Sequence, residues 1–221
     1  MPNTNILLPS KIDLEKFISD QAHDLRTPFN HITGFSKMLL NTLSVPPLTD
    51  IQREDLGTVY RSSMHALTLL NGLIDIARIN QHEKELSLKE TDIEQLLVQG
   101  LALWKKFHPG TEIQPEYQVQ TTLKTICADE LMIRQVISSV TAFVAQYCEP
   151  AEKVIISVTE QPDCFLFNFT AKGPKARQPS ELDRELFGCI NRTLIELHGG
   201  EIRQAEETDD GAVLQFSLLI K

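Results

Sequence analysis

The stretch that decides the fold is His23-Asp-Leu-Arg-Thr-Pro28, inside an amphipathic segment from about Lys11 to Leu43. Its apolar residues recur with the period of a helix, so we expect one long helix here. Residues four apart share a helix face, which places Thr27 one turn after His23, with Asp24 beside them. Pro28 has no backbone N–H to donate to the Asp24 carbonyl, so we expect a bend there. An imidazole, a carboxylate and a hydroxyl next to a bend are typical of a reaction site.

Composition limits the possible classes of protein. The chain has 221 residues, enough for one large or two small domains, and a formal net charge of −9. That charge argues against nucleic acid or an anionic membrane surface as a partner. No apolar run has the length of a signal peptide or a membrane span. We therefore expect a cytoplasmic protein that receives its input signal from another protein.

The four cysteines do not form a recognisable site. They are scattered and include no C-x-x-C pair, which predicts neither a zinc site nor a disulfide framework but core thiols in a reducing compartment. They are Cys127, Cys148, Cys164 and Cys189.

The first part of the chain predicts a helical hairpin. Apolar residues recur every seven positions at Ile18, Leu25, Ile32 and Leu39. Two prolines in residues 44–48 predict a turn, after which Thr49 or Asp50 can cap a second helix from about Ile51 to Ile79. A single hairpin cannot cover its own apolar stripe. We therefore expect residues 1–82 to form a homodimer with a four-helix bundle.

The remainder, residues 83–221, predicts an α+β domain with helices beside a mixed sheet. We expect helices at Ile93–Phe107, Glu130–Tyr147 with Asp129 as its cap, and Leu182–Leu197 with His198-Gly-Gly200 as its stop. We expect strands at Glu85–Glu90, Glu112–Tyr117, Thr122–Cys127, Lys153–Glu160, Phe165–Thr170, Glu201–Ala205 and Ala212–Ile220.

The segment Phe17-Ile-Ser-Asp-Gln-Ala-His-Asp-Leu-Arg-Thr-Pro28 resembles the H-box of bacterial two-component sensor histidine kinases. The likeness continues through residues 32–40. It returns at residues 73–79, which resemble the end of the family's second dimerisation helix, and at residues 129–136, which resemble the entry to its N-box helix. Residues 194–202 resemble the helix and strand that follow the family's second glycine-rich box. The resemblance spans nearly the whole chain. It implies a dimeric phosphoacceptor hairpin followed by an ATPase-type α/β sandwich.

The resemblance implies that His23 accepts a phosphoryl group. A neutral imidazole is a nitrogen nucleophile, and its ordinary pKa of about 6.5 leaves much of it neutral near pH 7. Asp24 can orient the ring or accept its proton. By family likeness Thr27 would position a water for dephosphorylating a partner, and Arg26 would bind phosphate. The alternative is an ordinary solvated histidine. For His31 and His65, which lack this setting, we expect surface or packing roles.

The nucleotide-binding half departs from the family pattern. Aligned from Gln135-Val136, the two N-box asparagines of the family fall on Ser139 and Phe143, and a phenyl ring offers Mg²⁺ no oxygen. The family's first glycine box, Asp-x-Gly-x-Gly, begins with an aspartate that binds adenine, and here Phe169-Thr-Ala-Lys-Gly173 replaces it. The second box is replaced by Glu185-Leu-Phe-Gly-Cys-Ile190. Glycine is what lets backbone approach phosphates closely in such loops. Only 14 residues separate Gly173 from Gly188, too few for the usual lid.

These observations predict a degenerate framework that keeps its phosphoacceptor and has no cofactor of its own. We expect His23 to exchange a phosphoryl group with a response-regulator receiver domain, which would hold the Mg²⁺, or to receive it from a separate histidine kinase. Three alternatives stay open. They are an active kinase with a divergent ATP pocket, a phosphatase for the receiver, and a non-catalytic receiver-binding scaffold.

Two smaller features favour structural roles. The acidic run Glu206-Glu-Thr-Asp-Asp210 lacks the regular spacing of a calcium loop, so we interpret it as a solvated hairpin tip rather than a metal site. Trp104-Lys-Lys-Phe107 ends a predicted helix, where the lysines suit the helix dipole and the aromatics can pack on the sheet.

Overall fold

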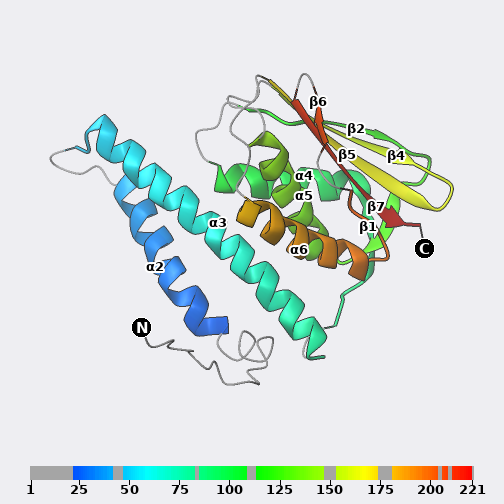
Figure 1. The fold of residues 1–221 in the computed structure, drawn as a ribbon, viewed down its shortest axis with the longest axis horizontal. Helices are drawn as coiled ribbons and strands as arrows, with labels where there is room; N and C mark the ends of the chain where they lie inside the picture. The colour runs from blue at the N-terminus through cyan, green and yellow to red at the C-terminus, as the bar shows by residue number, and fades with distance from the viewer. Residues whose placement is uncertain are drawn as a thin grey trace, which may run out of the picture. The chain divides into compact units, whose positions relative to one another are not determined.

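The computed structural model describes residues 22–41, 47–82, 85–108, 113–146, 153–173, 181–203, 206–208 and 211–220. Its contacts divide the chain into a helical unit, Met1–Glu85, and a sheet unit, Leu86–Lys221. The sheet is mixed and helices pack on it. The predicted α+β class is therefore confirmed, with a helical region followed by a mixed-sheet domain (Figure 1).

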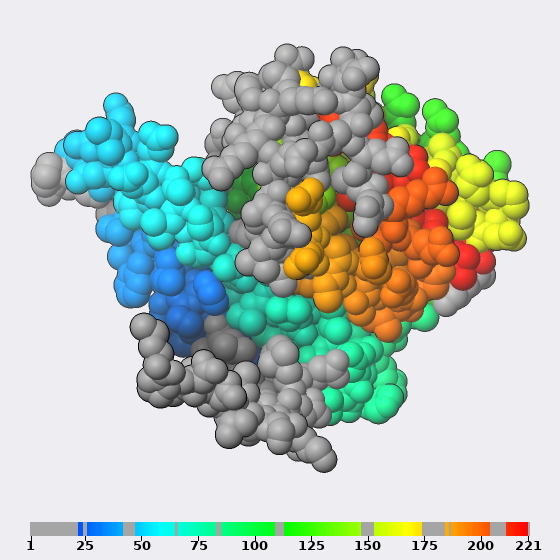
Figure 2. Space-filling view, viewed as in Figure 1, coloured from blue at the N-terminus to red at the C-terminus, as the bar shows by residue number. Residues whose placement is uncertain are grey.

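The helical unit contains α2 (Ala22–Asn41) and α3 (Asp50–Asn80), which pack against each other. In the space-filling view the blue surface of α2 lies directly against the cyan surface of α3 (Figure 2). Two small polar residues of α2, Thr33 and Ser36, are buried. The Thr33 hydroxyl donates to the Phe29 carbonyl at 2.8 Å, so its burial leaves no donor unpaired. Residues 11–21 and 42–46, also expected in this hairpin, lie outside the described residues.

The start of α3 is fixed by a capping box. The Thr49 hydroxyl accepts a hydrogen bond from the Gln52 N–H at 3.2 Å. The Gln52 side-chain carbonyl in turn accepts from the Thr49 N–H at 3.0 Å. Two N–H groups that a helix start leaves unpaired are thereby satisfied. Of the two caps that the sequence allowed, the structure uses Thr49.

The sheet unit is built on five strands in the order β2, β4, β5, β7, β6. β2 is parallel to β4, and the other neighbours are antiparallel. A separate antiparallel pair joins β1 and β3. The strands are β1 (Lys89–Asp92), β2 (Glu116–Gln120), β3 (Thr125–Ala128), β4 (Lys153–Glu160), β5 (Cys164–Lys172), β6 (Glu206–Thr208) and β7 (Gly211–Leu219). The helices α4 (Ile93–Phe107), α5 (Glu130–Ala145) and α6 (Glu181–Leu197) pack beside this sheet (Figure 1).

Alternation along the central strands places the core. In β4 and β5 every second residue is buried, which is the period of a strand with one covered face. The buried side chains of β5 include Phe165, Phe167 and Phe169, and those of β7 include Phe216. The rings of Phe167 and Phe216 stack with their centroids 4.7 Å apart. This aromatic layer supplies much of the apolar area that holds the helices on the sheet.

Several predicted strand bounds are wrong, and the register explains the main error. The expected strand from Glu85 begins only at Lys89, because Lys89 pairs with Ala128 and the next residue, Asp129, already caps α5. Residues 85–88 therefore have no strand beside them. The strands expected at 112–117 and 122–127 likewise begin later, as β2 and β3. In the strand expected at 201–205, the described residues 201–203 form one bridge, between Ile202 and Phe216, and residues 204–205 lie outside the described residues; β6 follows at 206–208.

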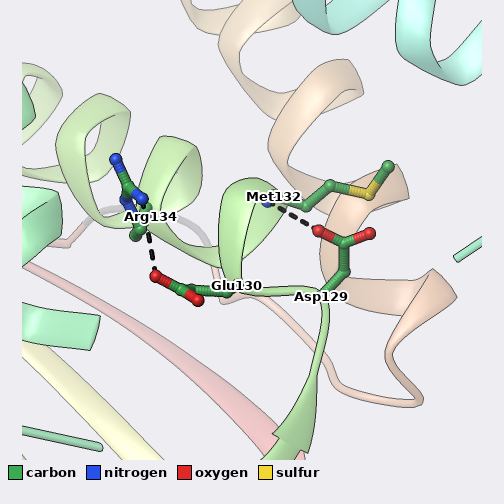
Figure 3. A network of polar contacts seen from close by, with 4 residues as sticks. All are labelled: Asp129, Glu130, Met132 and Arg134. Carbon is green, nitrogen blue, oxygen red and sulfur yellow. Dashed lines mark hydrogen bonds and ion pairs between the residues drawn. The ribbon is translucent and has the colours of Figure 1, made fainter. Parts of the chain in front are cut away.

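Asp129 joins three segments of the sheet unit. Its carboxylate caps α5 by accepting from the Met132 N–H at 3.3 Å, and it also accepts from the Ser87 N–H at 3.0 Å. Figure 3 shows this cap and the ion pair between Glu130, the first residue of α5, and Arg134. The two charged groups of that pair are 3.5 Å apart. The cap lies at the start of the segment that resembles the family's N-box helix. Its visible role is structural.

His198 completes this junction from the end of α6. The Asp129 N–H donates to His198 Nε2 at 3.1 Å. His198 Nδ1 lies 2.6 Å from the Leu194 carbonyl, so Nδ1 carries the proton. The sequence offered no reason for this histidine. The structure makes it a buried bridge, 3% exposed, between the end of α6 and the start of α5.

The Glu160 carboxylate closes the turn after β2 and makes stability depend on pH. It accepts from the Thr122 hydroxyl at 2.7 Å and from the N–H groups of Thr122 and Leu123 at 2.6 and 3.1 Å. These bonds, the hydroxyl first, hold the pKa of Glu160 below its ordinary value of 4.5. A depressed pKa stabilises the folded state fully above pH 4.5, and this stabilisation is lost as the pH falls through the folded pKa.

We expect Glu160→Gln to lower the free energy of unfolding at neutral pH and to converge with wild type in acid. The single tryptophan, Trp104, is 2% exposed in the sheet unit, so its fluorescence reports the unfolding of that unit. Denaturant titrations at several pH values measure the difference. Glu196→Gln, which removes an exposed helix charge, is the control. A difference that is independent of pH would refute the assignment.

Candidate functional site

His23 lies in the first turn of α2 with its side chain exposed. The Thr27 hydroxyl donates to the His23 carbonyl at 2.8 Å, which fixes the hydroxyl one turn from the imidazole. α2 continues through Pro28 to Asn41, so the proline interrupts neither the helix nor the spacing of these residues. The expected bend at Pro28 stays a prediction. An exposed imidazole on a regular helix is accessible to a partner protein.

The structure describes the side chains of some of the other predicted site residues and not of others. The Asp24 side chain lies outside the described residues, so its proposed help to His23 stays a prediction. His31 is exposed two turns along α2, and the His65 side chain is not described. Arg26 is part-buried and directed at α3.

Arg26 is held by a residue that the sequence did not single out. Its Nε–H donates to the Asn71 side-chain carbonyl at 2.6 Å, across 45 residues of sequence. Both side chains belong to the helical unit, Arg26 from α2 and Asn71 from α3. The available signal was a polar residue inside the apolar run Leu69-Leu-Asn-Gly-Leu-Ile74. An amide at such a position predicts a buried polar partner but does not say which one.

In the sheet unit, Phe143 is packed into a closed aromatic contact. Its ring stacks on Phe187 of α6 with centroids 3.8 Å apart and an angle of 6° between the planes. The two residues are 7% and 8% exposed. This is the position where the resemblance implies a magnesium-binding asparagine. The space beside Phe143 is filled by the ring of Phe187.

Ser139, the other N-box position, forms a hydrogen bond within the sheet unit. Asn191 of α6 donates through Nδ2 to the Ser139 hydroxyl at 3.1 Å and to the Phe187 carbonyl at 2.8 Å. Asn191 is 1% exposed. Side chains from α5 and α6 thus meet each other directly, through one aromatic stack and one amide.

The position of the family's adenine-binding aspartate is equally closed. Phe169 of β5 is fully buried and stacks on Phe216 of β7, with centroids 5.6 Å apart. A phenyl ring provides no acceptor for an exocyclic amine and no donor for a ring nitrogen. Phe169 is part of the apolar core of the sheet unit.

The glycines at the end of α6 have a structural role, as predicted. Gly199 has φ of +77°, the left-handed conformation that ends many helices. A Cβ at Gly200 would lie 1.9 Å from the Ser217 carbonyl oxygen, so only glycine fits between α6 and β7. By contrast, no described atom lies within 4 Å of a Cβ built at Gly188. Gly188 is one residue inside a helix rather than part of a close-approach loop.

The described residues contain no group of three or more metal-ligand side chains. Within the acidic run, residues 206–208 form β6, and Asp209 and Asp210 lie outside the described residues. Trp104 is buried, and its ring stacks on His108 at 5.3 Å. Among the described helices, none combines the length and the apolarity that crossing a membrane requires.

Comparison with known proteins identifies the helical unit. The family model "His Kinase A (phospho-acceptor) domain" matches residues 13–82. The circadian input-output histidine kinase CikA of Synechococcus elongatus is 27% identical over 213 residues, which cover 87% of this chain and 28% of the relative. The chain thus spans little more than a quarter of that protein.

Solved structures agree with the observed fold over most of the chain. Full-length ShkA in complex with AMPPNP is 25% identical with a TM-score of 0.62, covering 94% of this chain and 46% of that one. The histidine kinase ThkA in complex with the response regulator TrrA is 20% identical with a TM-score of 0.56, covering 94% and 62%.

A helical hairpin with an exposed H-box histidine, followed by an ATPase-like mixed-sheet domain, defines a histidine kinase-type two-component signalling protein. Residues 13–82 match the phosphoacceptor domain of histidine kinases, and the fold of the chain is similar to that of solved histidine kinases.

Proposed function

We propose that this chain is a histidine phosphotransferase that exchanges a phosphoryl group between His23 and a response-regulator aspartate, without an ATP site of its own. One observation carries the proposal. An exposed H-box histidine is kept, while the N-box position Phe143 is stacked on Phe187 at 3.8 Å. The first feature suits a phosphoryl carrier, and the second is incompatible with Mg²⁺–ATP at that position.

The transfer needs only chemistry that His23 and a receiver can supply. The lone pair of the unprotonated ring nitrogen attacks phosphorus, and a P–N bond forms. The P–O bond to the receiver aspartate breaks, and the aspartate leaves as a carboxylate. Mg²⁺ held by the receiver would supply positive charge for the phosphoryl oxygens. Asp24 accepts the proton that the other ring nitrogen gives up.

The closed sheet unit argues against autophosphorylation. Mg²⁺ requires oxygen ligands in near-octahedral geometry, and Phe143 offers none. Opening the Phe143–Phe187 contact would expose two rings that are now more than nine-tenths buried. Exposing rings of that size costs several kcal/mol, on the order of 2–3 for each. The favourable free energy of nucleotide binding would have to exceed this cost for the nucleotide to bind.

We propose that two copies pair through α2. Apolar side chains at Ile32, Phe35 and Leu39 are 42%, 63% and 40% exposed, at the i, i+3, i+7 spacing of one helix face. This face differs from the one that packs on α3, where Thr33 and Ser36 are buried. An exposed heptad stripe on a hairpin suits a second hairpin of the same kind, which gives a four-helix bundle.

We expect Phe35→Lys to convert the dimer to a monomer, because a buried lysine at the seam would be desolvated without a partner. Sedimentation of the full chain measures the change. Asn41→Lys adds the same charge at an exposed position off the stripe and should stay dimeric. Equal sedimentation of wild type and Phe35→Lys would contradict the proposed seam.

A receiver domain is the proposed partner. The related kinase ThkA has been solved with the response regulator TrrA, which supports this class of partner for a chain of the same fold. The exposed imidazole of His23 fits such a docking event, since the receiver aspartate must come within bonding distance of the ring.

Incubation with a receiver phosphorylated by labelled acetyl phosphate tests the proposal. Label that moves to the full chain and survives alkali, as phosphohistidine does, supports the relay. Free phosphate that depends on Thr27 supports a receiver phosphatase instead. Binding of the receiver without either product would leave a scaffold.

An ATP-dependent kinase is the second candidate. It is favoured by the similarity to ShkA, which was solved with the nucleotide analogue AMPPNP and covers 94% of this chain. Saturable Mg²⁺–ATP binding with label on His23 would establish it in place of the relay.

A further inference from the structure

We propose that Asn71 is a positioning residue for phosphoryl transfer, because it holds the Arg26 guanidinium at the phosphoacceptor end of α2. This inference rests on the proposed function. It adds a residue from the second helix to a site that the H-box motif places entirely on the first helix. The observation behind it is the bond from Arg26 Nε–H to the Asn71 carbonyl at 2.6 Å.

The Asn71 bond fixes the Arg26 guanidinium, and helix spacing places Arg26 one turn from His23. Arg26 follows His23 by three residues, so both side chains leave neighbouring positions on the helix surface. A free arginine loses rotamer freedom when it is immobilised. The Asn71 bond already restricts the Arg26 side chain before a phosphoryl group binds, so less rotamer freedom is lost on binding. Among the described residues this bond engages only Nε of Arg26, so the Nη1 and Nη2 donors can bind a phosphoryl group on His23.

The chemistry of the partner matters as much as its position. Asn71 is a neutral amide, so the bond orients the guanidinium without cancelling its positive charge. An aspartate at the same place could accept the same hydrogen bond but would form an ion pair with Arg26. The arginine would then be equally fixed and electrostatically less available to phosphate. Replacing the amide by a carboxylate is therefore expected to change the rate of phosphoryl transfer, whereas a role of Asn71 in packing alone predicts no change.

The test compares Asn71→Asp with Asn71→Ala in the full chain, using label transfer from a phosphorylated receiver. We expect Asn71→Asp to match or exceed wild type in thermal melting followed by circular dichroism, yet to transfer label about ten- to hundredfold more slowly. The loss should lie in the rate at saturating receiver, with the half-saturating concentration nearly unchanged. Asn71→Ala should also be slow, because the guanidinium is no longer held.

The control is Asn41→Asp, which adds the same charge at an exposed position near the other end of α2. It should transfer label at the wild-type rate. A wild-type rate in folded Asn71→Asp would overturn the positioning role, since a purely structural Asn71 predicts that result. Wild-type protein that takes no label would overturn the proposed function together with this inference. If Asn71→Ala fails to fold, Asn71→Asp alone decides.

Discussion

His23→Gln takes no label from a phosphorylated receiver, although it folds and dimerises like wild type. Glutamine is polar and of similar reach, but its amide nitrogen is not a nucleophile, so no P–N bond can form. Because His23 is exposed on α2, the substitution leaves packing intact, and its effect on stability should stay within about 0.5 kcal/mol. Label on the chain after gel separation in alkali measures the loss.

His31→Gln is the matched control, because His31 is also exposed on α2, two turns further along. It should accept label as wild type does. Retained label in His23→Gln, or equal losses in both variants, would show that the phosphoryl group is carried elsewhere.

Phe143→Ala destabilises the sheet unit by about 3–5 kcal/mol, the usual cost of removing a buried phenyl ring. The loss has two parts. One is the apolar area of a ring that is only 7% exposed, and the other is its stack on Phe187 at 3.8 Å. Denaturant unfolding followed by Trp104 fluorescence measures the change in the same unit. Phe143→Leu keeps most of the volume and should cost less than about half as much.

Leu131→Ala controls for the helix itself. Leu131 lies on α5 as Phe143 does, but it is 68% exposed, so its truncation should cost no more than about 0.5 kcal/mol. A cost below about 1 kcal/mol for Phe143→Ala would mean that the stack is not a packed contact and that the space between α5 and α6 can open.

Local signals in the sequence predicted the helix starts accurately. α4 has the bounds that were expected, and the caps Thr49 and Asp129 are observed. Each of these depends on residues a few positions apart. A cap needs only a side-chain oxygen and the N–H groups of the next turn.

Long-range partners were not predictable in the same way. The bond between Arg26 and Asn71 spans 45 residues, and the bridge from Asp129 to His198 spans 69. Strand bounds failed for a similar reason, since β1 begins where β3 supplies a partner rather than where alternation begins.

The loss of the N-box asparagine was visible in the sequence, but its replacement contact was not. Phe143 alone indicates that one oxygen ligand is missing. Its meaning depends on Phe187, which is 44 positions away in a different helix. Only the fold brings the two rings face to face and shows that the position is filled.

Titration of the full chain with Mg²⁺–ATP in a calorimeter, followed by a search for label from γ-labelled ATP on His23, tests the central claim most directly. The expected result is no saturable heat and no label, in a preparation that does accept label from a phosphorylated receiver. Saturable binding together with autophosphorylation that is lost in His23→Ala would contradict the account.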